Sequence, residues 1–247
     1  MYETIAAFYD RNIGEVNYDL MAEFLHKAFV TYRRTSNGDE RPILLDAACG
    51  TGECTVKMAA KGYDMIGLDI SPDMLQIAAE KPTADQIMWI CQDMTEMDLF
   101  GTVQAVLCMT DSINHLLEEE ELEGFLKGAS LFTEKGGLLI FDCLTDTYYR
   151  NVIDGNTFCQ EEEDFCYIWN GEYDGVICDY DITCFQKTGK EQYAKQKDSV
   201  TERMWTDGQL RRGLTEAGYS VTAVFSDLHF NRISRKDERR FYVCRKK

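Results

Sequence analysis

The segment from Ile43 to Cys143 alternates short apolar runs with longer amphipathic ones, and this pattern limits the fold more than any other feature. Apolar, β-prone runs predict strands, and helical spacing predicts helices. The strands are expected at 43–48, 65–70, 87–91, 103–109 and 138–143, and the helices at 53–61, 72–81 and 119–133. Because strands that alternate with helices build βαβ units, we expect a doubly wound, mostly parallel sheet.

Single residues mark the ends of these helices. Ser71 is suited to cap the second helix, with Pro72 at its first position. Gly62 is expected to end the first helix, and Gly136-Gly137 are expected to act as the stop signal soon after the third helix.

The flanking segments follow other patterns. Residues 2–34 carry apolar side chains at helical intervals, which predicts one or two helices packed on the edge of the sheet. Strand-like runs at 165–169, 176–185 and about 192–204, separated by glycine turns, predict an antiparallel meander. A helix capped by Asp207 and two β-rich runs, 219–226 and 240–244, then return to the sheet. We therefore expect a cap (1–40), an α/β core (41–150 and 205–247) and an antiparallel β insertion (151–204) that covers substrate.

Composition narrows the function classes. Lys and Arg total 26 against 43 for Asp and Glu, a formal net charge of −17 that disfavours nucleic acid and anionic membranes as partners. The ten cysteines form no C-x-x-C pair, so neither a metal site nor a disulfide framework is predicted. No apolar run approaches the roughly 20 residues of a membrane-spanning helix, and Met1 begins no signal-like segment. A cytoplasmic protein, monomer or homodimer, is expected.

A glycine-rich turn follows the first strand, in the run Leu45-Asp46-Ala47-Ala48-Cys49-Gly50-Thr51-Gly52-Glu53. Glycines at the carboxyl end of a parallel strand let the backbone approach a ligand closely, so a nucleoside-bearing cofactor fits this place. A dinucleotide loop would need a small residue three positions after Gly52, where Thr55 stands, and Glu53 would repel a pyrophosphate. A nicotinamide oxidoreductase is therefore the weaker alternative.

The spacing of Asp46, Gly50 and Gly52 resembles the first motif of class I S-adenosylmethionine-dependent methyltransferases. The resemblance implies a Rossmann-like fold with a mostly parallel seven-stranded sheet and S-adenosylmethionine as cofactor. It also implies that Asp69, at the end of the second strand, accepts hydrogen bonds from the ribose hydroxyls, and that Asp93 accepts from the adenine amino group. The cofactor-binding residues predicted are Tyr9, Tyr18, Asp46, Ala48, Gly50, Gly52, Asp69, Ile70, Gln92, Asp93, Met94 and Met109.

A second set of motifs resembles small bacterial methyltransferases in which an N-terminal helical cap covers the cofactor. These motifs are Phe8-Tyr9-Asp10, Tyr18-Asp19 and Asp111-Ser112-Ile113-Asn114. In this interpretation Tyr9 and Tyr18 close over the methionine end of the cofactor, where their rings face the sulfonium. Both tyrosines also fit an ordinary helix core.

Methyl transfer from a sulfonium needs positioning more than a dedicated base. Where the acceptor must lose a proton, Asp111 and His115 are the catalytic candidates, with Asp142 behind them. His115 also fits a plain position at the start of a helix. A binding module without catalytic activity remains an alternative.

Residues 154–181 contain nine acidic side chains and no Lys or Arg, interleaved with aromatic residues. As part of a covering insertion, these acids favour a small neutral or cationic methyl acceptor, such as an amine. The same acids also fit the solvated face of strands whose aromatic side chains pack below.

Overall fold

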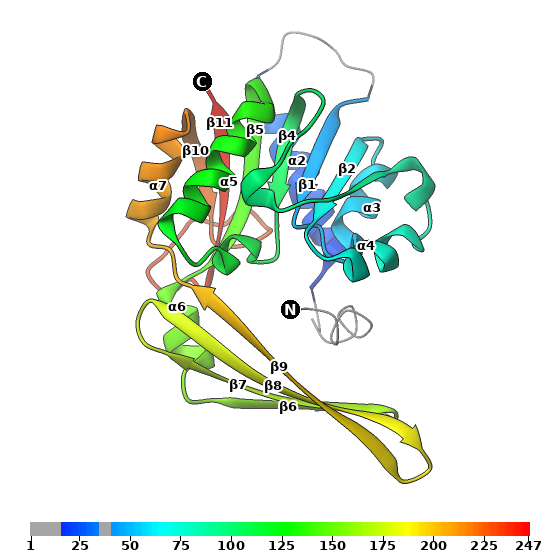
Figure 1. Cartoon of the computed structure of the whole chain (residues 1–247). Coiled ribbons are helices and arrows are strands. Elements are labelled where there is room, and N and C mark those ends of the chain that lie inside the picture. The colour runs from blue at the N-terminus through cyan, green and yellow to red at the C-terminus, as the bar shows by residue number, and fades with distance from the viewer. Residues whose placement is uncertain (1–15, 35–40) are drawn as a thin grey trace.

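The computed structural model describes residues 16–34 and 41–247, and its core is a seven-stranded sheet (Figure 1). The strands are β1 (Ile43–Ala47), β2 (Asp64–Asp69), β3 (Met88–Cys91), β4 (Val103–Cys108), β5 (Thr133–Leu144), β10 (Tyr219–Phe225) and β11 (Arg239–Lys246). Their order is β10-β11-β5-β4-β1-β2-β3, and β11 alone runs antiparallel to its neighbours β5 and β10. The predicted Rossmann-like, mostly parallel sheet is confirmed.

Helices cover both faces of this sheet (Figure 1). On one face, α5 (Glu119–Phe132) and α7 (Asp207–Glu216) pack their apolar sides on β1, β4 and β5. On the other, α2 (Tyr18–Tyr32) and α3 (Glu53–Ala60) share a core with β4, β5 and β11. The helix α4 (Pro72–Ala79) packs against β2 and β3, and it begins as predicted, because the Ser71 hydroxyl accepts a hydrogen bond from the Met74 N–H (3.3 Å).

The predicted place of the N-terminal helix at the edge of the sheet is wrong. The helix α2 buries an apolar stripe of six residues, Met21, Ala22, Phe24, Leu25, Ala28 and Phe29. A stripe of this width needs the apolar face of the sheet to cover it, whereas an edge strand offers only its rim. The helix therefore belongs to the core of the sheet.

Two sequence signals predicted to mark helix ends do not have that role. The helix α5 passes directly into β5 at Thr133, and Gly136-Gly137 lie inside that strand. Gly136 has a φ of +82°, and a Cβ there would lie 2.1 Å from the Arg34 carbonyl oxygen. The pair thus permits close backbone packing and does not end the helix. The cap of α7 is Thr206, not Asp207, because Thr206 and Gln209 form a reciprocal capping box.

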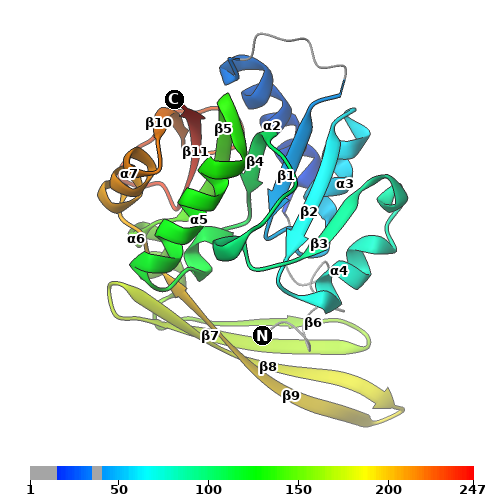
Figure 2. The same cartoon turned by 45° about the horizontal axis from the view of Figure 1, so that its top comes forward.

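A separate antiparallel sheet interrupts the core between β5 and α7. Its strands, in order, are β6 (Thr157–Glu161), β7 (Phe165–Tyr173), β8 (Ile177–Gly189) and β9 (Gln192–Arg203). Short helical segments, α6 (Asp146–Tyr148) and η4 (Tyr149–Ile153), lead into it. Figures 1 and 2 place this sheet beyond the carboxyl ends of the core strands. The sequence did not predict β6, whose one large apolar side chain, Phe158, stacks on Trp169 of β7.

The nine acidic residues of 154–181 are all exposed. Four of them lie in strands, where they are neighbours of less exposed residues such as Tyr173, Cys178 and Tyr180, as the two-residue period of a strand requires. The other five lie in the segments before and between these strands, so these acids belong to the solvated surface of the second sheet. Within residues 16–34 and 41–247, no helix combines the length and the apolar character that crossing a membrane demands.

Candidate active site

The glycine-rich loop after β1 has a backbone that its sequence makes possible. Gly50 and Gly52 have φ values of +54° and +76°, which side chains other than glycine rarely adopt. A Cβ on Gly52 would lie 2.6 Å from the ring of Trp89, and one on Gly67 of β2 would lie 2.3 Å from it. The Trp89 indole of β3 therefore packs directly on the backbone of both glycines, and this contact keeps the loop close to the sheet.

Asp69 ends β2 and ties this loop to its neighbour. Its carboxylate accepts hydrogen bonds from the backbone N–H groups of Gly50 (2.7 Å) and Ser71 (2.9 Å). Burial raises the pKa of Asp69, and these backbone donors oppose the rise. The result is a largely buried carboxylate at the junction of two strand ends.

Asp46 lies beneath the same loop, and its carboxylate accepts a hydrogen bond from the Thr55 hydroxyl (2.5 Å). Thr55, at the position where a dinucleotide loop would need a small residue, thus bonds the helix to the strand beneath the loop. Burial raises the pKa of Asp46 to about 7, opposed by the Thr55 hydrogen bond and increased by the nearby Asp69.

The raised pKa of Asp46 makes stability depend on pH. Below about pH 4 the carboxyl is protonated in both the folded and the unfolded chain. As pH rises to about 7 the unfolded chain loses this proton first, so the free energy of unfolding falls. We expect Asp46→Asn to remove this part of the pH dependence, measured by urea unfolding from pH 4 to pH 8. The control is Asp64→Asn: Asp64 begins β2 and is half-exposed, so this variant should keep the pH slope of the natural chain. An Asp46→Asn variant that also keeps this slope would contradict the assignment.

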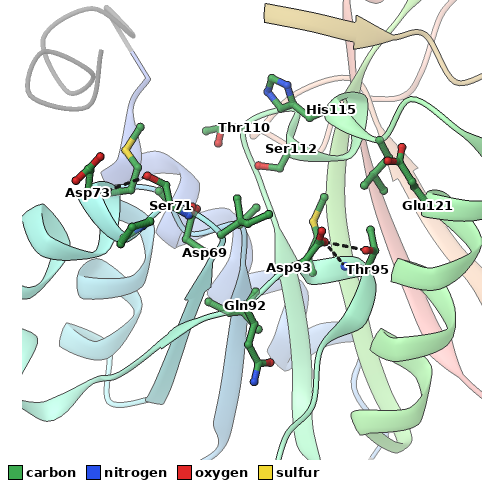
Figure 3. A pocket seen from close by; sticks show the side chains of 18 residues that line it. Asp69, Ser71, Asp73, Gln92, Asp93, Thr95, Thr110, Ser112, His115 and Glu121 are labelled. Carbon is green, nitrogen blue, oxygen red and sulfur yellow. Dashed lines mark hydrogen bonds between the residues drawn. The ribbon is translucent and has the colours of Figure 1, made fainter. Parts of the chain in front are cut away.

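A pocket of about 480 Å³ opens at the carboxyl ends of β1 to β4 (Figure 3). In Figure 3, Asp69, Ser71 and Asp73 lie on one side, and Thr110, Ser112 and His115 lie across from them. The predicted cofactor residues that line it are Ala48, Gly50, Asp69, Ile70, Gln92, Asp93 and Met94.

The side chains of two of these residues form hydrogen bonds with other residues of the protein. The Gln92 amide exchanges hydrogen bonds with the backbone of Asp98 (3.3 and 3.0 Å) and points away from the pocket in Figure 3. Gln92 thus lines the pocket while its side chain bonds to Asp98, and its part in cofactor binding stays a prediction. The Asp93 carboxylate accepts from the N–H and the hydroxyl of Thr95, both at 2.8 Å, which fixes its position at the pocket wall.

The other predicted cofactor residues lie outside this pocket. Tyr18, Asp46 and Met109 line a much smaller adjoining hollow, which shares Ala48, Gly50 and Thr110 with the main pocket. Gly52 lines neither, and its contribution is to the loop backbone. Tyr9 falls outside the described residues.

The loop after β4 carries Asp111, one of the two predicted catalytic residues. Thr110 and Asp111 both have left-handed φ values, +57° and +55°, a conformation that costs free energy without glycine. The Asp111 carboxylate pairs with Arg239 of β11 (2.8 Å), and its N–H donates to Asp142 (3.1 Å). Because Asp111 is held by a cation and lines neither pocket, the prediction of a base role for it is not supported.

His115 ends the short turn η3 (Ser112–His115) and lines the main pocket. Its Nε2 lies 3.9 Å from an oxygen of Glu202, a residue of β9 that no sequence motif marks. Glu202 is buried and accepts hydrogen bonds from the hydroxyls of Tyr149 and Tyr180, both at 2.9 Å. The two-residue period of β9 could have indicated it, because it places Glu202 on the same face as the buried Val200.

The end of β9 is fastened to the turn that carries His115. The Asn114 amide donates to the Arg203 carbonyl (2.8 Å) and accepts from the Leu144 N–H (3.0 Å). The Trp205 indole N–H reaches the carbonyls of Ile113 (3.2 Å) and Leu116 (3.1 Å). The end of the second sheet is therefore bonded to the turn that forms one wall of the pocket.

Comparison with known proteins identifies the core. Residues 44–137 match the family model described as Methyltransferase domain. A protein of Geobacillus sp. (strain WCH70) that bears the name putative methyltransferase is 30% identical over 99% of both chains. The crystal structure of an S-adenosylmethionine-dependent methyltransferase from Clostridium acetobutylicum superposes with a TM-score of 0.87 (22% identity, 99% and 98% covered). An amino pentose methyltransferase from Micromonospora echinaspora gives 0.74 (19% identity, 99% and 98% covered).

Proposed function

Because the chain belongs to the class I S-adenosylmethionine-dependent methyltransferases, we propose that it methylates the nitrogen of a small amine held between the strand ends and the second sheet. The observation that carries this proposal is the 480 Å³ pocket, with the Asp69 carboxylate on one side and the His115 imidazole across from it. The family match leaves the nicotinamide oxidoreductase without support.

The residues of the pocket fit the cofactor. A buried carboxylate with spare acceptor capacity, Asp69, suits the two ribose hydroxyls, and the wall formed by Asp93 and Met94 suits adenine. Glycines 50 and 52 keep side chains out of the loop that the nucleoside would cross. When bound, S-adenosylmethionine supplies an electrophilic methyl group whose S–C bond breaks with the electron pair left on sulfur.

The acceptor would enter from the side of His115. An amine that arrives protonated must lose a proton before its lone pair can attack, and an imidazole is the side-chain group that most often serves as a general base. The amino pentose methyltransferase with the same fold acts on an amine-bearing small molecule, which supports this acceptor class.

We extend the proposal to the division of the chain. Residues 41–150 and 205–247 would bind the cofactor, residues 151–204 would cover the acceptor, and residues 1–40 would cap the cofactor. The hydrogen bonds of Asn114 and Trp205 support the covering role, since they hold the second sheet against the pocket wall.

Turnover on a panel of amines and carboxylic acids tests the acceptor class, with S-adenosylhomocysteine release as the readout. We expect amines to be methylated, and His115→Gln to lower kcat/KM by about 100-fold, the usual contribution of a general base. The exposed His229→Gln is the matched control and should stay within twofold of the natural chain. Turnover confined to carboxylic acids, or full activity in His115→Gln, would reject this proposal.

A further inference from the structure

Glu202 is a charged residue in a place where strands usually put apolar ones. It lies in β9 on the buried face of the second sheet, 6% exposed, while the nine acids of 154–181 lie outside. Burying a carboxylate costs free energy unless hydrogen bonds and opposite charge compensate it. The groups that compensate the charge of Glu202 therefore indicate its role.

The two carboxylate oxygens of Glu202 face different partners. Tyr149 of η4 and Tyr180 of β8 both donate to Oε2, while Oε1 is the oxygen nearest the imidazole of His115 (3.9 Å). Asp111, Tyr148 and Cys178 also act on this cluster electrostatically, and Asp69 interacts with His115 from across the pocket. The two tyrosines thus fix the carboxylate from behind and leave one oxygen directed at the residue on the pocket wall.

Burial raises the pKa of Glu202, Asp111 adds to the rise, and His115 and the two tyrosine donors lower it. A negative carboxylate about 4 Å from the ring can balance a positive charge that forms on it during the reaction. A carboxylate that holds an imidazole and balances its charge is a common arrangement in acid–base sites.

We propose that Glu202 is a positioning residue for His115: it holds the imidazole toward the acceptor and stabilises the charge gained when the ring takes a proton from an ammonium group. This inference rests on the proposed function. In the step, one N–H bond of the ammonium breaks, its electron pair stays on nitrogen, and the proton passes to the imidazole. The lone pair of the neutral amine would then form the new N–C bond while the S–C bond of the methyl donor breaks and leaves its electron pair on sulfur. The amine preference thus comes from one buried acid of β9 and not from the exposed acids around it.

The test measures charge at the transfer position without needing the acceptor. In sinefungin a carbon that bears an amino group replaces the sulfur that bears the methyl group, so its ammonium lies at the position of the methyl group that the acceptor attacks. Binding of sinefungin and of S-adenosylhomocysteine is compared by calorimetry at one pH. We expect Glu202→Gln to weaken sinefungin about tenfold while S-adenosylhomocysteine stays within twofold.

Two further variants sharpen this comparison. Glu172→Gln removes the same charge from an exposed position of β7 and should change neither ligand. Glu202→Asp keeps the charge and should restore most of the sinefungin preference. A purely structural role for Glu202 would weaken both ligands alike, and that result would overturn the proposal.

Should Glu202→Gln fail to fold, as judged by its melting curve, Glu202→Met replaces it, because it removes the charge and fills a similar volume with apolar atoms. It must cancel the same sinefungin preference, and retention of the preference would overturn the proposal. Failure of the proposed function looks different: S-adenosylhomocysteine binds and no amine is methylated, yet the ratio of the two affinities still reports on Glu202.

Discussion

Replacing Asp69 with alanine is expected to weaken the binding of S-adenosylhomocysteine about a thousandfold. Its carboxylate is the acceptor proposed for both ribose hydroxyls, and each hydrogen bond to a charged group contributes about 1.5–3 kcal/mol. The same carboxylate holds the Gly50 N–H, so its loss also loosens the loop that the nucleoside crosses. Calorimetric titration with S-adenosylhomocysteine measures the effect.

Two variants separate recognition from folding. Asp69→Asn keeps one carbonyl acceptor for the Gly50 N–H and should recover the loop but only part of the affinity. Asp64→Ala removes a carboxylate from the opposite end of β2 and should bind like the natural chain. An affinity within threefold of the natural chain in Asp69→Ala would refute the proposed ribose site.

The residues that the sequence identified best are those whose position along the chain also fixes their position in space. Asp46 lies near the end of β1, Gly50 follows that strand and Asp69 ends β2, and the carboxyl ends of neighbouring parallel strands meet at one edge of the sheet. Strand periodicity and loop chemistry therefore place them together without knowledge of side-chain contacts. The sheet itself was predictable for the same reason.

The contacts that the sequence did not reveal join segments far apart in the chain. Glu202 meets His115 across 87 positions, and Arg239 meets Asp111 across 128, so no local spacing relates them. Asp111 was predicted as a candidate base because its position in the sequence does not indicate the ion pair with Arg239. The exposed acids of 154–181 looked functional because charge in a sequence does not tell which face of a strand carries it.

The cluster of Arg239, Asp111 and Asp142 makes the second large prediction. Asp142 is fully buried, and burial raises its pKa, while Arg239 opposes the rise. Removing one partner of a buried ion pair leaves an uncompensated charge, which typically costs about 3–5 kcal/mol. We therefore expect Arg239→Met to lower the free energy of unfolding by about that amount, measured by urea denaturation at pH 7.5. Arg240→Met, the same change at the next position, should cost less than half as much.

Proton linkage tells this loss apart from a simple packing defect. Without Arg239 the pKa of Asp142 rises further, so the folded chain holds a proton that the unfolded chain releases at lower pH. The deficit of Arg239→Met should therefore shrink as pH falls toward 5, and adding Asp142→Asn should restore most of the stability at pH 7.5. A deficit that is constant with pH and not rescued by Asp142→Asn would mean that Arg239 acts by packing alone. Because Asp111 shares this cation, the ion pairs also hold the left-handed backbone beside Thr110, and with it one wall of the pocket.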